Sequence, residues 1–217
     1  MKLNNKKIAI IGLGIAGMST AIRLKKHGYE PVIIERASER RNGGYFIGLF
    51  RKGLDAAQEL GVLQDIKLYT PEEIHSIEVD AEGNQTRGVG FLEQPGVPQA
   101  TLRASIEEGL WKHVEHEIEV RFATTLVAID DQKEKVQATF KNSLTGEEYK
   151  EDFGLIIGAD GVRSQVRRMV FGPDEKFLQS LNTMVVAFQM SKQAPQLHQS
   201  DSAVLAEAKR AIWIFWS

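Results

Sequence analysis

The sequence contains no cysteine among its 217 residues. Disulfide bonds, thiolate metal sites and cysteine nucleophiles are therefore excluded, and the chain fits a reducing compartment, which favours a cytoplasmic location. A long apolar run is also lacking, because the first apolar stretch, at 8–17, is interrupted by glycine and is too short to span a bilayer. The formal net charge of -2 gives no sign of binding to nucleic acid or to an anionic membrane.

The rest of the composition is that of an ordinary globular protein, with 42% hydrophobic and 26% charged residues. The length fits one large domain or two small ones. The five histidines show no spacing suited to a metal ion, so no metal site is predicted.

The N-terminal segment alternates between strand and helix patterns. Residues 6–11 and 31–36 are short β-branched runs typical of buried parallel strands, and 15–27 follow a helical period. Gly28 is expected to end this helix. The order strand, helix, strand predicts a parallel βαβ unit.

The sequence GLGIAG lies between the first strand and the helix, at residues 12–17. In a G-x-G-x-x-G turn, Gly12 forms the tight turn, Gly14 lets the backbone approach a diphosphate, and Gly17 lets helix and strand pack closely. The helix N-terminus, with Ile15 and Ala16, would supply free N–H groups to the phosphates. This context favours a dinucleotide site over a purely structural turn.

Glu35 stands at the end of the second predicted strand, where a carboxylate can accept hydrogen bonds from both ribose hydroxyls. The same carboxylate would repel a 2′-phosphate, which argues against NADP at this site. Glu35 does not separate NAD from FAD, since both carry an adenosine with free ribose hydroxyls.

Further elements are expected along the chain. Helices are predicted at 51–61, about 101–115 and about 164–171, and strands at 74–80, 86–93, 119–130, 135–141, 148–160, 181–190 and 210–217. The strands from 119 onward resemble a strand and a β-meander that returns to a buried strand at 153–157. We therefore predict a nucleotide-binding domain over 1–172, with an inserted β region at about 70–100, and an incomplete second sheet over 173–217.

Three further segments carry a family resemblance: ERASERRNGGYFIGL at 35–49, TLRASIEEGL at 101–110 and GLIIGADGVRSQVRR at 154–168. Together with the glycine turn they resemble the class A flavoprotein monooxygenases, the family of p-hydroxybenzoate hydroxylase and the tetracycline-modifying monooxygenases. The resemblance implies an α/β fold: a Rossmann-like FAD-binding domain with a β-meander, plus part of a β-sheet substrate domain.

The resemblance also implies roles for individual residues. Asp160 and Gly161 would lie near the FAD diphosphate and the path of NADPH, and Arg103 would contact the FAD phosphate or ribityl region. Arg36 would flank the adenosine and Gly44 would lie near the flavin side. The backbone at 125–127, at Leu126, would border the adenine.

Plainer interpretations remain open for some of these residues. Arg103 could be a surface residue at a helix start, and Asp160–Gly161 could be a simple turn pair. Arg163, Arg167 and Arg168 could form a solvated face, and for the last two this is the expectation.

The reaction that the resemblance implies is hydroxylation of an aromatic or polycyclic small molecule, with FAD as cofactor and NADPH or NADH as co-substrate. In that family the flavin carries the chemistry, so no catalytic residue is predicted. The apolar residues Phe91, Leu92, Phe188 and Met190 suit such a substrate but would serve equally as core.

The family's downstream Gly-Asp flavin motif has no counterpart here, and the sequence ends in the apolar run at 210–217. We expect the N-terminal part of a longer enzyme. The alternatives are a non-catalytic FAD- or ADP-binding remnant, which could form a homodimer through an exposed sheet edge, and another flavin oxidoreductase of the same superfamily. An NAD-linked dehydrogenase is disfavoured because no second substrate domain is seen.

Overall fold

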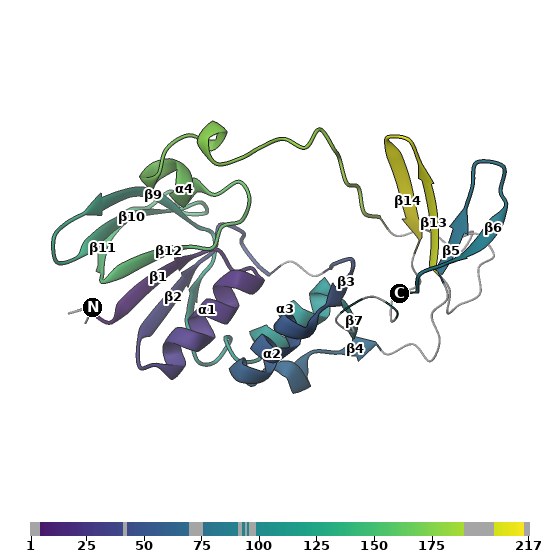
Figure 1. Cartoon of the computed structure of the whole chain (residues 1–217). Coiled ribbons are helices and arrows are strands. Elements are labelled where there is room, and N and C mark those ends of the chain that lie inside the picture. Colours follow the sequence, from purple (N-terminus) through teal and green to yellow (C-terminus); the bar gives the residue numbers. More distant parts are fainter. Residues whose placement is uncertain are drawn as a thin grey trace. The chain divides into compact units, whose positions relative to one another are not determined.

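The computed structural model describes residues 5–40, 43–69, 76–90, 93, 95, 99–188 and 202–214. The chain forms two compact units, Met1–Asn42 with Glu107–Met184 and Gly43–Ile106 with Val185–Ser217, and each is described by itself (Figure 1). Within the described ranges, no helix is long and apolar enough to cross a bilayer.

The first unit is built on a parallel sheet in the order β12-β1-β2-β8. Its strands are β1 (Lys7–Ile11), β2 (Glu30–Ile34), β8 (Glu119–Arg121) and β12 (Leu155–Gly158). Helix α1 (Ile15–Lys26) connects β1 to β2, and Gly28, just past its end, has φ +78°. The predicted βαβ unit and its glycine stop are confirmed, because glycine adopts this left-handed conformation without strain.

An antiparallel meander packs on one face of the parallel sheet. It consists of β9 (Thr124–Asp131), β10 (Val136–Asn142) and β11 (Glu148–Phe153), in the order β11-β10-β9. The interface is apolar, because alternate residues of β1 and β2 meet side chains of the meander and of the helix after β12. Its buried residues are Ala9, Ile11, Val32, Ile34, Leu126, Ala138, Phe140, Phe153 and Val166. Helix α1 lies against β1 and β2 on the side away from the meander (Figure 1).

The segment predicted as one strand at 119–130 is two strands that belong to different sheets. Ala123, between β8 and β9, has φ +49°, and its N–H donates to the Ala37 carbonyl at 2.7 Å. A residue in this left-handed conformation turns the chain. As a result β8 extends the parallel sheet, and β9 begins the meander.

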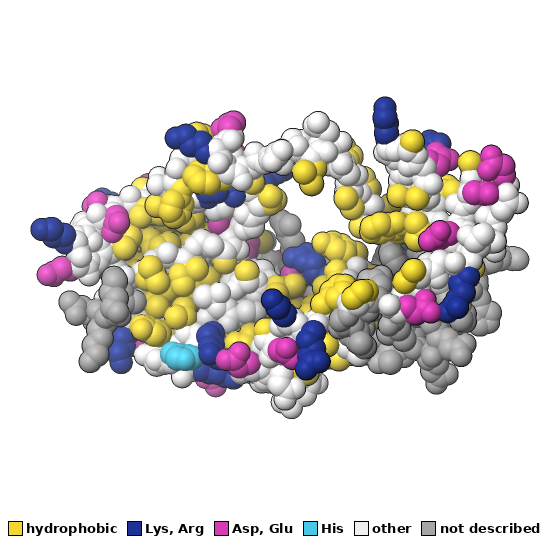
Figure 2. All heavy atoms as spheres, viewed as in Figure 1, with side chains coloured by type: hydrophobic (Ala, Val, Ile, Leu, Met, Phe, Trp, Pro, Cys, Tyr) yellow, Lys and Arg dark blue, Asp and Glu magenta, His cyan; other side chains and the backbone are white. Residues whose placement is uncertain are grey.

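The segment after the parallel sheet contains a short helix and then irregular chain. Helix α4 (Gln165–Val170) confirms the helix predicted at 164–171, and the 3-10 turn η3 (Asp174–Lys176) follows it. The strand predicted at 181–190 is wrong over 181–188, which is irregular, has φ +53° at Asn182 and pairs with no described strand. Without a partner strand the backbone lacks ladder hydrogen bonds, and Figure 2 shows apolar side chains exposed along this segment.

The second unit holds two smaller sheets. One has the order β14-β13-β5-β6 and contains β5 (Ser76–Val79), β6 (Gln85–Gly88), β13 (Ser202–Glu207) and β14 (Arg210–Ile214). The other has the order β3-β7-β4 and contains β3 (Phe46–Leu49), β4 (Leu68–Tyr69) and β7 (Gln99–Leu102). Strands from the predicted insert and from the predicted second sheet therefore pair in one sheet.

The remaining helical elements are α2 (Arg51–Leu60), the 3-10 turn η1 (Leu63–Asp65) and α3 (Arg103–Trp111). Gly61 ends α2 with φ +73°, as the sequence predicts. Helix α3 starts later than the predicted residue 101, because residues 99–102 pair as β7 with β3.

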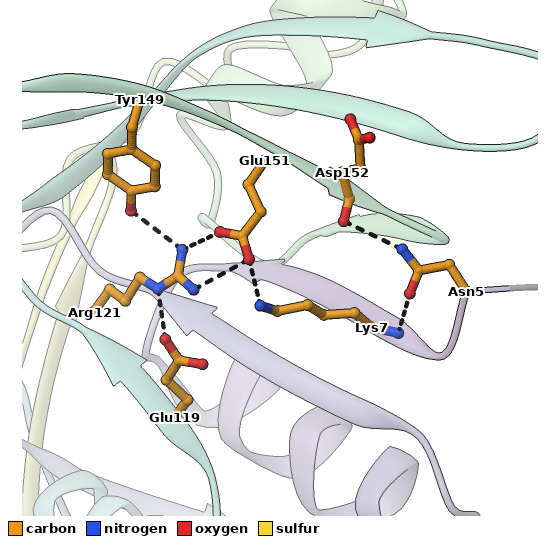
Figure 3. Close-up of polar contacts among 7 residues, drawn as sticks. All are labelled: Asn5, Lys7, Glu119, Arg121, Tyr149, Glu151 and Asp152. Atoms are coloured by element: carbon orange, nitrogen blue, oxygen red, sulfur yellow. Dashed lines mark hydrogen bonds and ion pairs between the residues drawn. The ribbon is translucent and has the colours of Figure 1, made fainter.

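A charged network ties the meander to the parallel sheet (Figure 3). The Arg121 guanidinium of β8 donates to the Glu151 carboxylate of β11, to Glu119 Oε1 at 2.7 Å and to the Tyr149 hydroxyl at 3.3 Å. Lys7 of β1 forms an ion pair with the same Glu151 carboxylate. Burial disfavours the charged form of Glu151, but the bonds from Arg121 and Lys7 outweigh it and hold the pKa of Glu151 below its usual range.

The substitution Glu151→Gln is expected to lower the free energy of unfolding at pH 7 by about 1–2 kcal/mol, since it leaves two cations without their shared carboxylate. Because the pKa of Glu151 is lowered on folding, its contribution is present at neutral pH and is lost as the pH falls through this lowered pKa, below the ordinary value of 4.5. Denaturant unfolding at pH 7 and pH 3 measures both effects.

The matched control is Glu148→Gln on the same strand, which removes an exposed ion pair with Lys141 at 3.3 Å and should change stability little. Equal losses in the two variants, or a Glu151→Gln loss that does not shrink in acid, would contradict the role given to the network.

Candidate functional site

The glycine turn at the carboxyl end of β1 is held by contacts between backbones. Gly12 has φ +111°, and a Cβ added there would lie 2.5 Å from the Ala159 carbonyl oxygen. A Cβ added at Gly17 would overlap the carbonyl oxygen of Gly12. Both positions therefore require glycine, as the sequence motif predicts.

Gly14 differs from the two glycines beside it. A Cβ added at Gly14 meets nothing within 4 Å, and the residue has an ordinary extended backbone with φ -79°. Gly14 is the N-cap of α1, no side chain caps the helix there, and none of its first-turn residues is acidic. The N-terminus of α1 is therefore a suitable site for an anion, because the N–H groups of its first turn, which includes Ile15 and Ala16, point out of the helix.

The Glu35 carboxylate fastens this turn to the end of β2. One oxygen accepts the Leu13 N–H at 2.9 Å and the other accepts the Ala37 N–H at 2.8 Å. The backbone of Glu35 also accepts the Thr124 N–H at 2.9 Å, at the start of β9. A carboxylate has further lone pairs beyond these two bonds, so Glu35 can still accept from ribose hydroxyls. Arg36, the next residue, is exposed.

Asp160 lies directly beside the glycine turn, but its carboxylate accepts hydrogen bonds from the start of helix α4. The Asp160 Cα would be 3.1 Å from a Cβ at Gly12. The carboxylate accepts the Ser164 hydroxyl at 2.5 Å and the Gln165 N–H at 2.5 Å, so it caps the start of α4. Gly161 follows with φ +80°. Asp160–Gly161 is therefore a true turn pair that also abuts the glycine turn.

Leu126 lies on β9, two residues after Thr124, whose N–H donates to the Glu35 carbonyl. Its side chain is almost completely buried, and its carbonyl accepts the side-chain amide of Gln165 at 3.0 Å. Gly12, Gly14, Gly17, Glu35, Leu126 and Asp160 all belong to the first unit.

Gly44 and Arg103 belong to the second unit, where they lie together. A Cβ added at Gly44 would be 2.7 Å from the Ala104 nitrogen and 2.9 Å from the Arg103 Cβ. The Arg103 N–H donates to the Tyr45 carbonyl at 3.1 Å. Arg103 is partly buried and is the first residue of α3, so the predicted position at a helix start is confirmed.

Some residues of this region gave no signal in the sequence. Gln165 bonds to a strand far from it in the chain. Arg40 holds the loop after Glu35, because its guanidinium pairs with Glu108 at 2.5 Å and lies 4.8 Å from the centre of the Trp111 ring. Contacts of this kind join residues with no characteristic spacing, so a motif search does not find them.

The solvated face expected for Arg167 is wrong. Its side chain is only 19% exposed, and its guanidinium donates to the Val162 carbonyl at 2.8 Å and to Asp174 at 2.5 Å. Hydrogen bonds from Arg167 lower the pKa of Asp174. The 3-10 turn at Asp174 brings this carboxylate back onto α4, which the sequence pattern does not indicate. Arg168 is more exposed, at 44%, and also contacts Asp174, at 3.2 Å.

The residues expected near the substrate are placed only in part. Phe188 is described and is exposed. Phe91, Leu92 and Met190 lie outside the described residues. Among the residues that are described, no group of three or more histidine or acidic side chains could hold a metal ion.

Comparison with known proteins gives the family of this chain. The family model described as "FAD binding domain" matches residues 5–214. The chain belongs to this FAD-binding-domain family. The match covers the turn at Gly12, Glu35 and the Asp160–Gly161 pair, and it confirms the resemblance to the class A flavoprotein monooxygenases.

Two curated relatives are similar over most of the chain. One is an uncharacterized protein of Mycobacterium tuberculosis, 30% identical over 190 residues, with 84% of this chain and 49% of the relative covered. The other is a flavin-dependent monooxygenase of an unknown prokaryotic organism, 31% identical over 187 residues, with 84% and 46% covered. The chain thus spans about half the length of the curated relatives that it matches.

Two solved structures share the fold of the FAD-binding-domain family. The tetracycline destructase Tet(51) is 30% identical, with a TM-score of 0.62 over 80% of this chain and 43% of that one. The complex of aklavinone-11 hydroxylase with FAD and aklavinone is 21% identical, with a TM-score of 0.62 over 77% and 35%.

The substitutions Gly17→Ala and Gly14→Ala should differ in how much they lower stability. Gly17→Ala forces a methyl group against the Gly12 carbonyl and should lower the free energy of unfolding by about 1–3 kcal/mol. Gly14→Ala places its methyl group in open space and should lower the free energy of unfolding by no more than about 1 kcal/mol, because alanine is a poorer N-cap residue than glycine. Denaturant unfolding of the two variants and the wild type measures the two changes in the free energy of unfolding. Equal destabilisation would refute the open position at Gly14.

Proposed function

We propose that this chain is the FAD-binding part of an NAD(P)H-using, FAD-dependent monooxygenase that hydroxylates an aromatic or polycyclic small molecule. The observation that carries the proposal is the open position at Gly14, on the uncapped N-terminus of α1 and next to Glu35. A ligand with a diphosphate beside a ribose fits this arrangement of donors and acceptor.

The β1–α1–β2 motif would act as a Rossmann-like nucleotide-binding fold. The diphosphate would lie against Gly14, with the N–H groups of Ile15 and Ala16 directed at it. The adenosine ribose would be held by Glu35 and flanked by Arg36. A carboxylate at this place disfavours a 2′-phosphate, which supports FAD over NADP as the resident nucleotide.

The other predicted contacts are proposals of the same kind. The backbone at Asp160 and Gly161 would border the diphosphate, while the Asp160 carboxylate keeps its role as the cap of α4. Leu126 would lie on the adenine side. Gly44 and Arg103, which lie together in the second unit, would contact the flavin side of the cofactor.

A bound flavin would supply the redox chemistry, with NADPH or NADH as the source of electrons. The protein's own residues would bind and orient it, and no residue of this chain is assigned a proton transfer. Tet(51) and aklavinone-11 hydroxylase carry the names of polycyclic compounds, which supports this class of substrate for the complete enzyme.

A second candidate is a nucleotide-binding protein without oxygenase activity, which could form a homodimer. It is favoured by the matching family model, whose description names FAD binding and no reaction. The two candidates differ in what the purified chain does. Yellow protein that oxidises NADPH faster when a phenolic compound is added supports the monooxygenase, whereas colourless protein that binds only ADP supports the alternative.

The substitution Gly14→Ala tests the site directly. Its added methyl group would occupy the place proposed for the diphosphate, so affinity for FAD and for ADP should fall at least about tenfold, while the free energy of unfolding falls by no more than about 1 kcal/mol. Isothermal titration calorimetry measures the affinities.

The control for that experiment is Gly146→Ala, in the turn between β10 and β11, where a Cβ also meets nothing within 4 Å. Its φ of +75° makes alanine costly in stability, but nucleotide affinity should not change. Unaltered affinity in Gly14→Ala would overturn the placement of the diphosphate.

A further inference from the structure

A closed circuit of contacts surrounds the glycine turn. Gly12 packs against the backbone of Asp160. The Asp160 carboxylate accepts the N–H of Gln165 at 2.5 Å, and the side-chain amide of Gln165 donates to the carbonyl of Leu126 at 3.0 Å. Gln165 therefore joins the turn after β12 to strand β9.

The circuit returns to the glycine turn through Glu35. Thr124, two residues before Leu126 on β9, donates its N–H to the Glu35 carbonyl at 2.9 Å. The Glu35 carboxylate in turn accepts the N–H of Leu13, inside the glycine turn, at 2.9 Å. The carboxyl ends of β1 and β2 are thus connected to Asp160 and to β9 by a closed series of contacts. Gln165 belongs to this series through its side-chain amide.

The strand that Gln165 contacts is irregular at that point. The pairing with β10 passes from Ala128 directly to Leu126, so Val127 is an extra residue in the ladder. Such bulges locally disrupt pairing and change the direction of a strand. The hydrogen bond from Gln165 reaches Leu126, the residue beside the bulged Val127, and so adds a contact next to the irregular point of the ladder.

We propose that Gln165 is a positioning residue for the nucleotide site, which holds the bulged segment 126–128 of β9 as a fixed wall for the base. This rests on the proposed function, in which the chain binds the adenosine diphosphate half of FAD. The role is distinct from anion binding by α4, because Asp160 already accepts the N–H groups of Gln165 and Val166.

The test uses Gln165→Met, which keeps the length of the side chain but removes the donor. ADP and UDP share the ribose and the diphosphate and differ in the base, so they separate a wall for the base from general support of the turn. Calorimetric titration should show ADP affinity reduced about three- to tenfold, as for one lost hydrogen bond, with UDP affinity changed less than about twofold.

Two further variants complete the experiment. Gln137→Met removes a comparable amide bond, to Asp152 at 3.0 Å between β10 and β11, and should leave both affinities unchanged. Gln165→Lys keeps a donor on a flexible stem and should restore most of the ADP affinity. Amide hydrogen exchange at 126–128 should become faster in Gln165→Met and not in Gln137→Met.

The outcomes distinguish the two proposals. If the wild type binds ADP and Gln165→Met binds it equally well, the positioning role is overturned and the proposed function stands. An equal fall for ADP and UDP also overturns it, because the effect would then not concern the base. A wild type that binds neither nucleotide overturns the proposed function, and the positioning role with it.

Discussion

The whole arrangement depends on the close backbone packing at the carboxyl end of β1. Gly12 lies against Ala159 and Asp160, and Gly17 lies against Gly12, at separations that leave no room for a side chain. The pairing of β1 with β12, in which Ile11 is opposite Gly158, brings this distant part of the chain to the turn. Because these contacts fix where α1 begins, they also fix the open position at Gly14 and the place of the Asp160 turn beside it.

Helices α1 and α4 both begin near this packing, and their N-termini differ in how they are capped. The first two amides of α4 are bonded to Asp160, and Ser164, its N-cap residue, accepts the N–H of Arg167 in the same first turn. The start of α1 has neither a capping side chain nor an acidic residue in its first turn. An anion placed here would therefore find its N–H donors at the start of α1, because those at the start of α4 are already bonded to Asp160. Glu35 contributes both to the structure of the turn and to nucleotide binding. Its carboxylate accepts the N–H of Leu13 and has further lone pairs that can accept hydrogen bonds from ribose hydroxyls.

Much of this could be predicted from the sequence because the signals are local. The β-branched runs and the glycine spacing predict β1–α1–β2, and Arg103 is found at a helix start as expected. The failures have non-local causes. Ala123 turns the chain between β8 and β9, with its N–H bonded to the loop after Glu35. Residues 181–188 pair with no strand in the described part of the chain, although their apolar pattern is that of a strand. Gln165 and Arg167 owe their positions to Leu126 and Asp174, which no spacing rule connects to them.

The central claim is that the start of α1, and not that of α4, receives the diphosphate of a nucleotide. Titration of the isotope-labelled chain with ADP, followed by the backbone amide resonances, tests it most directly. Large shifts are expected at Gly14, Ile15 and Ala16, with much smaller ones at Gln165 and Val166, whose N–H groups are already bonded to Asp160. Shifts confined to Gln165 and Val166, or no shifts at saturating ADP, would contradict it.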